Sequence, residues 1–254
     1  MLETHGLTRQ FGGLLAVNRV DLNINEGEIV SIIGPNGAGK TTVFNLITGQ
    51  FRPSAGRVVF GGRDITGRAP HAVAKAGITR TFQTTRVFGE LDLVQNLLVS
   101  RHCRTRSGVL GALLRSASVL REERVSEGKA RDMLAFVGLG AHATRKASEL
   151  PTEAQQRLAV ALALAAQPKL VLLDEPTGGM NDDEVQGLVR LIYRIRDTGV
   201  TIGLIEHRMK VVMGISDRVV VLDHGVKIAE GSPVEIQQDL NVIAAYLGTS
   251  ETGT

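Results

Sequence analysis

Runs of apolar residues mark the strands that this sequence predicts for its interior. Residues 24–33 pass from alternating apolar and polar positions into an almost continuous apolar run over 29–33. This pattern is typical of a strand buried on both faces, as in a parallel sheet. Residues 170–173 and 200–205 have the same character. The remaining predicted strands are a short one at 58–60 and a hairpin of 218–222 with 225–229.

Apolar residues at helical spacing predict helices over 40–48, 72–76, 153–167, 185–196 and 209–215. The second half of the 153–167 segment is apolar on every side, so we expect that helix to be buried. Residues 91–137 follow a helical pattern with no strong strand, which indicates a helical insertion. Together these elements predict an α/β fold that carries such an insertion.

The length and composition of the chain indicate its domain size and its location in the cell. The chain has 254 residues, of which 43% are apolar and 22% charged, enough for one large globular domain or for one domain with an appendage. Its longest apolar run, 158–166, is much shorter than the roughly 18 residues that a membrane span needs. The first residues lack the basic and apolar regions of a secretory signal, so we expect a cytoplasmic protein. Cys103 is the single cysteine, which excludes an internal disulfide.

The net charge of +3 is unevenly distributed. Residues 101–131 contain eight basic and three acidic residues, a local charge of +5 that leaves −2 for the rest. A solvated helical face is the default interpretation of such a run. Nucleic-acid binding is not expected, because the segment interleaves no aromatic residues with its charges.

A glycine-rich loop between the strand at 29–33 and the helix at 40–48 carries the strongest chemical signal. It fits the phosphate-binding pattern G-x-x-x-x-G-K-[ST], and its residues are Gly34, Pro35, Asn36, Gly37, Ala38, Gly39, Lys40 and Thr41, followed by Thr42. In such a loop the backbone N–H groups bind phosphates, the lysine reaches the β and γ oxygens, and the Thr41 hydroxyl binds Mg²⁺. The N-terminus of the following helix adds a favourable dipole. We therefore predict a nucleoside triphosphate site.

A pair of carboxylates at the end of the 170–173 strand adds hydrolytic chemistry. Asp174 is placed to hold Mg²⁺ through its water shell. Glu175 is placed to polarise a water molecule for attack on the γ-phosphate, so we expect hydrolysis and not binding alone. The sequence has no Asn-Lys-x-Asp for reading guanine, which favours ATP over GTP.

With these motifs the chain resembles ATP-binding subunits of ABC transporters over residues 2–248. The resemblance implies that Phe11 stacks on adenine and that Gln83 contacts Mg²⁺ and the attacking water. It also implies that the loop at 179–181 crosses a dimer interface and that His207 contacts the γ-phosphate. In fold, it implies a P-loop NTPase (ABC ATPase) with an antiparallel β-rich N-terminal subdomain and a helical insertion.

Further segments are similar to the ATP-binding subunits of branched-chain amino acid importers. They are residues 63–67, 70–71, 77–83, 215–218 and 242–248. The resemblance implies ATP hydrolysis, with ATP and Mg²⁺ as cofactors, that drives uptake of branched-chain amino acids or a related small polar solute. The implied partners are permease subunits, a second ATP-binding subunit (identical or different) and, indirectly, a solute-binding protein. The implied location is the cytoplasmic face of the membrane. In this family the helical subdomain faces the membrane subunits, so the resemblance gives the basic segment at 101–131 an alternative role as a surface that faces anionic lipid, where each basic residue contributes about 1 kcal/mol.

The chain departs from this family at the signature segment Leu-Ser-Gly-Gly-Gln/Glu. Residues 150–154 read Leu-Pro-Thr-Glu-Ala instead. In the family this segment binds the γ-phosphate held by the other subunit. Pro151 lacks an N–H and a hydroxyl, and Glu153 places a carboxylate near a polyanion. We therefore expect asymmetric ATP sites, with this chain's own phosphate loop intact and its signature segment impaired. Two further residues differ from the family pattern. Leu162 stands where the family usually has Arg, and Arg208 stands where Asp usually follows the histidine.

Two other functions remain open at this stage. One is a nucleotide-binding regulatory subunit with little hydrolysis, which the altered signature favours and Glu175 argues against. The other is an ABC ATPase that powers no transport; such proteins often carry two nucleotide domains, and this chain has one. In either case we expect a single ATP-binding domain over 1–248, a helical subdomain at about 88–153 and a loose tail at 249–254.

Overall fold

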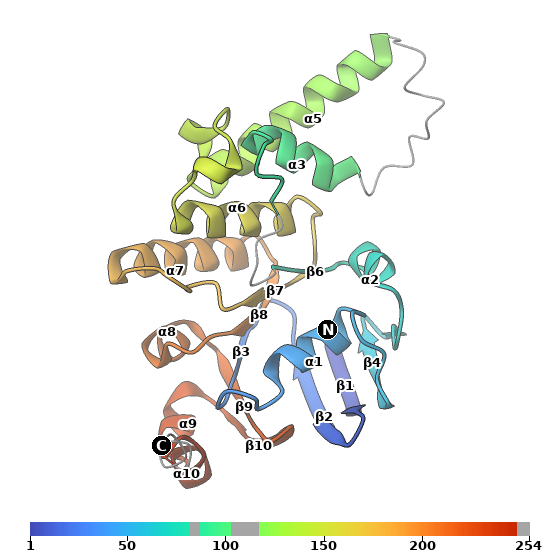
Figure 1. Cartoon of the computed structure of the whole chain (residues 1–254), viewed down its shortest axis with the longest axis vertical. Helices are drawn as coiled ribbons and strands as arrows, with labels where there is room; N and C mark the ends of the chain where they lie inside the picture. Colours follow the sequence, from blue (N-terminus) through green and yellow to red (C-terminus); the bar gives the residue numbers. More distant parts are fainter. Residues whose placement is uncertain (82–86, 103–116, 248–254) are drawn as a thin grey trace.

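Two β-sheets organise the chain in the computed structural model, which describes residues 1–81, 87–102 and 117–247 (Figure 1). The smaller sheet is antiparallel, in the order β2-β1-β4-β5. Its strands are β1 (Leu2–Phe11), β2 (Leu14–Ile24), β4 (Ala55–Phe60) and β5 (Arg63–Asp64). Apolar and polar residues alternate along β1 and β2, so each of these strands turns one face inward.

The larger sheet has six strands in the order β10-β9-β3-β8-β7-β6. They are β3 (Ile29–Ile33), β6 (Ile78–Arg80), β7 (Leu170–Asp174), β8 (Thr201–Ile205), β9 (Arg218–Asp223) and β10 (Val226–Gly231). All neighbours are parallel except the β9–β10 hairpin. Every residue of β3, β7 and β8 is buried, as expected for central strands covered on both faces.

Helices cover both faces of this sheet. They are α1 (Lys40–Ile47), α2 (Pro70–Ala76), α3 (Leu93–His102), α5 (Ala117–Phe136), α6 (Thr152–Leu164), α7 (Asp182–Asp197), α8 (Met209–Ile215), α9 (Pro233–Gln238) and α10 (Leu240–Leu247), with 3-10 turns at Gly140–His142 and Ala147–Glu149. Helix α1 shares one apolar core with the antiparallel sheet and with β3. A second core joins α3, α5, α6 and α7 to the other face of the large sheet, and a third joins α8, α9 and α10 to β9.

The helices α3, α5 and α6 form the helical part of the chain, which lies beyond α7 in Figure 1. Leu93, Leu97 and Leu134 are fully buried where α3 and α5 pack together above α6. Most of α6 is buried too, in agreement with its apolar sequence. None of the helices in the described part of the chain is long and apolar enough to cross a bilayer.

The predicted α/β fold with an antiparallel β-rich N-terminal part is confirmed, and several element boundaries were wrong. Helix α6 ends at Leu164 and not at 167, and α7 begins at Asp182 and not at 185. The segment at 24–33 contributes to two strands, because β2 ends at Ile24 and β3 begins at Ile29 in the other sheet. The turn between them depends on Gly27, whose φ of 75° favours glycine. The predicted 218–229 hairpin is present as β9 and β10.

Candidate functional site

A pocket of about 520 Å³ opens where the loop after β3, the end of β1 and the ends of β7 and β8 meet. Most of the residues predicted for nucleotide binding and catalysis line it. They are Phe11, Asn36, Gly37, Ala38, Gly39, Lys40, Thr41, Thr42, Glu175 and His207. The carboxyl ends of parallel strands are the usual location of ligand sites in α/β sheets.

The phosphate loop turns sharply between β3 and α1, and its glycines are required for that path. Gly34 has a φ of 147°, and a Cβ there would lie 2.0 Å from the carbonyl oxygen of Leu222. Gly39 has a φ of 97°, and its Cβ would lie 2.5 Å from the carbonyl oxygen of Ala16. Only glycine fits either position. The loop is therefore held against β9 and β2, and the N–H of Ala38 donates to the carbonyl of Pro35 within the loop.

Lys40 is buried and folds back over the loop. Its Nζ donates to the carbonyl oxygens of Gly34 and Pro35, at 2.7 and 2.8 Å. Burial lowers the pKa of Lys40, while the charges of Glu175 and Asp174 act in the opposite direction. The carbonyl groups of the loop thus orient the ammonium, which interacts electrostatically with both carboxylates.

Asp174 ends β7 as a buried side chain, 3% exposed. Its Oδ2 accepts a hydrogen bond of 2.5 Å from Nη2 of Arg80. Burial raises the pKa of Asp174, and the adjacent Arg80 guanidinium opposes that rise. The second carboxylate oxygen, Oδ1, is buried without a hydrogen-bond partner among the described residues.

An unpartnered, buried carboxylate oxygen suits a hard cation. Mg²⁺ at nucleotide sites is typically held by one or two carboxylate or hydroxyl groups together with substrate phosphates. The described residues contain no cluster of three or more His, Cys, Asp or Glu side chains that would hold a metal by themselves. Asp174 and the half-buried Thr41 in the first turn of α1 are the residues that fit Mg²⁺ here.

Glu175 and His207 form a close pair at the mouth of the pocket. Oε1 of Glu175 lies 2.6 Å from Nε2 of His207. Glu175 adopts a φ of 49°, uncommon for a residue other than glycine, and its N–H donates to the carbonyl of Ile205. Both side chains are partly exposed. This pair is therefore positioned to act on a water molecule or a phosphate in the pocket.

A buried residue that the sequence analysis did not identify supports this pair. Glu206 is 3% exposed, and its Oε1 accepts hydrogen bonds from the N–H groups of His207 and Arg208. Its Oε2 accepts a 2.6 Å hydrogen bond from the hydroxyl of Thr177, in the loop after β7. Glu206 thus ties the loop that carries His207 to the loop that follows Glu175.

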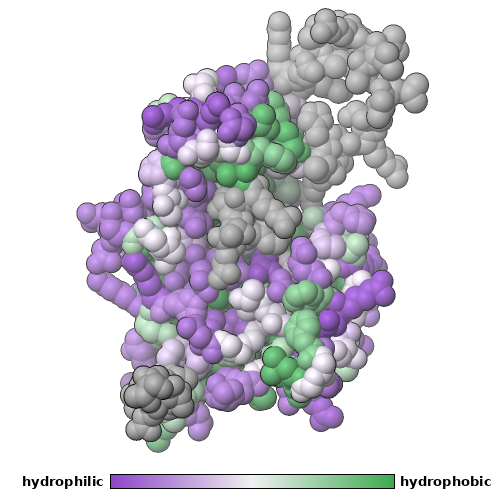
Figure 2. Space-filling model, in the orientation of Figure 1, coloured by the Kyte–Doolittle hydropathy of each residue, from purple (hydrophilic) through white to green (hydrophobic). Residues whose placement is uncertain are grey.

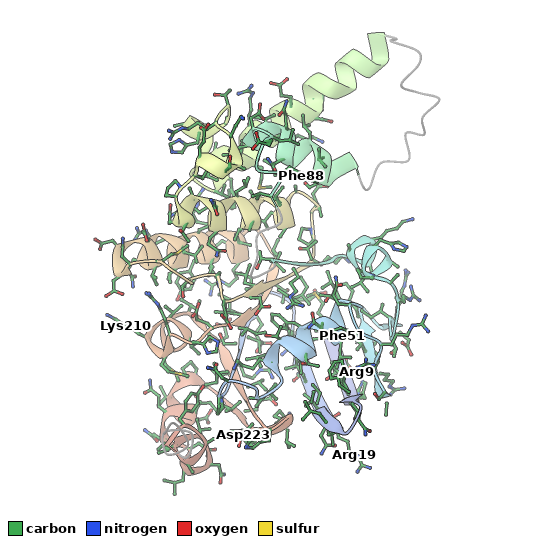
Figure 3. The ribbon with its side chains drawn as sticks, viewed as in Figure 1. Arg9, Arg19, Phe51, Phe88, Lys210 and Asp223 are labelled. Atoms are coloured by element: carbon green, nitrogen blue, oxygen red, sulfur yellow. The ribbon has the colours of Figure 1, made fainter. Side chains whose placement is uncertain are left out.

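Phe11 lies at the apolar end of the pocket. The guanidinium of Arg9 is 4.4 Å from the centre of its ring, and Phe51 meets it edge to face at 5.2 Å. Figure 3 labels Arg9, on β1, and Phe51, in the connection between α1 and β4. Leu14 and Leu15 extend this apolar wall and are exposed, and Figure 2 shows hydrophobic surface in the same region, over the ends of β1 and β2. The arrangement suits a flat, weakly polar group such as a nucleobase.

One predicted residue lies outside the described structure, and one residue of the pocket was not predicted. Gln83 lies at 82–86, outside the described residues, so its predicted role stays a prediction. His224, by contrast, was not predicted but lines the pocket from the β9–β10 turn, with a φ of 44°. Its position at a hairpin tip gave no local signal of a ligand site.

The altered signature segment begins α6. Pro151 is the N-cap residue and offers no side-chain cap, so the helix starts without one. Glu153 forms an ion pair with Arg157 one turn later, and Arg157 also donates to the carbonyl of Val137 at 3.1 Å. The carboxylate is therefore neutralised within its own helix, which reduces the charge repulsion expected from the sequence. The segment still lacks the serine hydroxyl and the two glycines of the family pattern.

The loop after Glu175 passes the start of α6. A Cβ on Gly179 would lie 3.3 Å from Cγ2 of Thr152, which places this loop against the signature segment. Arg208 donates from Nη2 to the carbonyl of Met180 at 2.5 Å. Asn181 then caps α7 through a reciprocal pair of hydrogen bonds with Glu184. Arg208, which has no predicted role, thus tethers this loop to the His207 loop.

Comparison with known proteins identifies the family. A profile described as "ABC transporter" matches residues 17–178, which include the phosphate loop and the Asp174–Glu175 pair. The chain belongs to the ABC transporter family. It is an ATP-binding cassette and an ATPase of that family, as the pocket predicts. A second profile, "Branched-chain amino acid ATP-binding cassette transporter", matches residues 226–252 of the same cassette.

The similarity to other ATP-binding cassettes extends over nearly the full length of the chain. The "high-affinity branched-chain amino acid transport ATP-binding protein" LivG of Salmonella typhimurium is 44% identical, over 98% of both chains. BraF of Pseudomonas aeruginosa, with the same description, is also 44% identical over 98% of each. A nucleotide-free ATP-binding cassette of known structure matches with a TM-score of 0.85 and 31% identity, covering 97% of this chain and 98% of that one. An ADP-bound cassette matches with a TM-score of 0.85 and 30% identity over 98% of both.

Proposed function

We propose that this cassette hydrolyses ATP to drive uptake of branched-chain amino acids, or of a related small polar solute, through separate permease subunits. The observation that carries the proposal is the Glu175–His207 pair in the same pocket as the Lys40 loop. A binding protein without turnover would not need a carboxylate placed beside a histidine there. The cargo is inferred from relatives that are described as branched-chain amino acid transport proteins.

The chemistry follows from the positions of the side chains. The loop from Gly34 to Thr42 would hold the phosphates, with the Lys40 ammonium at the β and γ oxygens. Glu175 would accept a proton from the attacking water, and His207 would orient Glu175 and contact the γ-phosphate. Thr41 and Asp174 would hold Mg²⁺, which supplies charge neutralisation at the phosphates. Phe11 would stack on the adenine, and Gln83 keeps its predicted role at the metal and water.

A groove beside β6, the edge strand of the large sheet, supports a permease partner. It encloses about 570 Å³ between α2 and the helices α3 and α6, and most of its lining is apolar. Phe88, labelled in Figure 3 beside α3, is 55% exposed on this groove. A short helix from a membrane subunit is the occupant that we propose, since an amphipathic helix buries its apolar face in such grooves.

The proposal also covers the domain boundaries of the chain and its location in the cell. We propose one ATP-binding domain over 1–248 with a helical subdomain at about 88–153, peripheral at the cytoplasmic face of the membrane. A solute-binding protein would act through the permease. Of the eight basic residues at 101–131, the structure describes the side chains of Lys129 and Arg131, both exposed. The solvated face therefore stays the default interpretation of this segment, and contact with lipid stays its alternative.

The altered signature supports a pair of unlike subunits. In a dimer, the start of α6 from one subunit would complete the ATP site of the other. Pro151 and Glu153 offer fewer donors to phosphate than the family segment does, although the backbone N–H groups of the first turn remain. We propose a second ATP-binding subunit with an intact signature, so that the site built on this chain's Lys40 and Glu175 is the active one.

Reconstitution tests the proposal. The chain is co-expressed with a candidate branched-chain amino acid permease pair and a second cassette, purified as a complex and placed in liposomes. We expect ATP-dependent leucine uptake that a Glu175→Gln variant abolishes. ATPase activity without any permease association would point to a non-transport ABC ATPase. A permease complex that transports equally well with Glu175→Gln would instead indicate a regulatory subunit.

A further inference from the structure

Arg80 connects three parts of the structure through one buried side chain. It ends β6, and its side chain is 5% exposed. Nη2 donates to Oδ2 of Asp174 at 2.5 Å, and Nη1 donates to Oδ1 of Asn45 at 2.7 Å. The guanidinium also lies 5.6 Å from the centre of the Phe44 ring. Contacts with β7 and α1 therefore fix the plane of this guanidinium.

The fixed guanidinium determines the orientation of the Asp174 carboxylate. A planar guanidinium is a more rigid partner for a carboxylate than a lysine ammonium, which rotates on a flexible stem. With Oδ2 held by Arg80, the buried Oδ1 is the carboxylate oxygen left for a ligand, and no described residue hydrogen-bonds to it. Outer-shell partners of this kind orient metal-binding carboxylates.

Arg80 also forms part of the groove beside the edge strand β6. It lines this groove together with Thr79 and Thr81 from its own segment and Ala159 and Leu162 from α6. A segment seated in the groove would therefore lie near the same side chain that holds Asp174. The groove and the metal carboxylate share one buried residue, so no longer chain of contacts is required to connect them.

We propose that Arg80 is a positioning residue that holds Asp174 for Mg²⁺, and that a permease segment in the groove alters the Mg²⁺ requirement through Arg80. The second part rests on the proposed function, because it needs a permease. The first part concerns the isolated chain alone. Contact of the segment with the guanidinium would change how firmly Oδ2 is held, and with it the orientation of Oδ1.

The first experiment measures Mg²⁺-dependent binding of a fluorescent ATP analogue, mant-ATP, to the full chain. We expect Arg80→Gln to raise the half-saturating Mg²⁺ concentration by at least about tenfold, with binding in EDTA changed less than about twofold. Arg63→Gln, at an exposed arginine of β5, is the matched control and should leave both values unchanged. An Arg80→Gln value within twofold of wild type would overturn the proposal.

Loss of Arg80 leaves a buried carboxylate without its cation, so thermal unfolding of each variant is measured first. Arg80→Lys keeps the positive charge and provides the test if Arg80→Gln does not fold. We expect it to raise the half-saturating Mg²⁺ concentration by at least about threefold, because the ammonium cannot reproduce both hydrogen bonds. No change in this folded variant would show that the Arg80 geometry does not position Asp174.

The second experiment repeats the Mg²⁺ titration on the purified permease complex. We expect complex formation to shift the half-saturating Mg²⁺ concentration of the wild-type chain and to leave that of Arg80→Lys unshifted. An equal shift in both would overturn the role of Arg80 in transmission. If the wild-type chain forms no permease complex, the proposed function fails, while the titration of the isolated chain still decides the positioning role of Arg80.

Discussion

Nε2 of His207 lies 2.6 Å from Oε1 of Glu175, although the two residues are 32 positions apart in sequence. Glu175 directly follows β7 and His207 lies two residues after the end of β8, and the parallel pairing of Asp174 with Ile205 brings the two loops together. A carboxylate that is hydrogen-bonded to an imidazole is oriented, and orientation is what a general base requires. This contact is the basis for the prediction about turnover.

Glu175→Gln should reduce ATP turnover by at least about 100-fold, because the amide cannot accept the proton of the attacking water. ATP affinity should change little, since the phosphate loop does not depend on Glu175 for its shape. Steady-state ATPase assays and mant-ATP titration of the assembled transporter measure the two effects. Glu26→Gln, at an exposed turn position, is the control. Turnover above a tenth of wild type would exclude Glu175 as the base.

Gly34→Ala should abolish nucleotide binding. Its Cβ would meet the carbonyl oxygen of Leu222 at 2.0 Å, and this contact cannot relax without moving β9 or the loop. The loop that holds the phosphates would shift or the protein would lose stability, and both are measurable by mant-ATP titration and thermal unfolding. The control is Gly214→Ala in α8, where an added Cβ meets no atom within 4 Å. Normal mant-ATP affinity in Gly34→Ala would contradict the close approach.

Arg218, the first residue of β9, is the centre of an ion-pair network. It donates from Nε and Nη2 to the carboxylate of Glu28 at 2.7 and 2.9 Å, and it pairs with Glu230. Arg218→Met should lower the free energy of unfolding by about 2 to 3 kcal/mol, because hydrogen bonds between charged groups are lost. Arg63→Met, at an exposed site, should change it by less than about 0.5 kcal/mol. Urea denaturation measures both.

The same network predicts an acid dependence. Burial raises the pKa of Glu28, but hydrogen bonds from Arg218 and the Asn25 backbone outweigh that effect, so the pKa lies below its ordinary value of 4.5. A carboxylate with a lowered folded-state pKa stabilises the fold above about pH 4.5 and loses this contribution as the pH falls. The stability difference between wild type and Arg218→Met should therefore shrink below pH 4.5. A constant difference down to pH 3 would contradict this assignment.

The altered signature predicts weak activity for the chain by itself. A symmetric dimer of this chain would use the Pro151–Glu153 segment at both sites, and each lost hydrogen bond to a charged phosphate costs about 1.5 to 3 kcal/mol. Replacing Pro151 with Ser and Glu153 with Gly should raise the ATPase rate of the isolated chain by about tenfold or more. Brisk turnover by the isolated wild-type chain would contradict the asymmetry.

The Glu153–Arg157 ion pair requires its own control for that experiment. Removal of Glu153 leaves Arg157 without its carboxylate, so an Arg157→Gln variant with the native signature separates the two effects. We expect Arg157→Gln to leave the low ATPase rate unchanged, because Arg157 lies one turn beyond the segment. A rate increase in Arg157→Gln would show that the ion pair, and not the missing donors, limits turnover.

Local chemistry could be predicted from the sequence alone. The glycines before Lys40, the apolar strand that ends at Asp174 and the apolar helix at α6 are signals contained in a few consecutive residues. A tight loop needs glycine, and a strand buried on both faces needs apolar residues throughout, so these patterns indicate their structure without distant contacts. The α/β fold and the phosphate site followed from them.

The tertiary structure alone decided which distant residues meet. The hydrogen bond from Arg80 to Asp174 and the two loops joined by Glu206 depend on the order and register of strands in the large sheet. His224 reaches the pocket because β9 lies beside β3. Such contacts cross gaps in sequence that no local pattern spans. They are set by how strands and helices pack, which is a property of the whole chain.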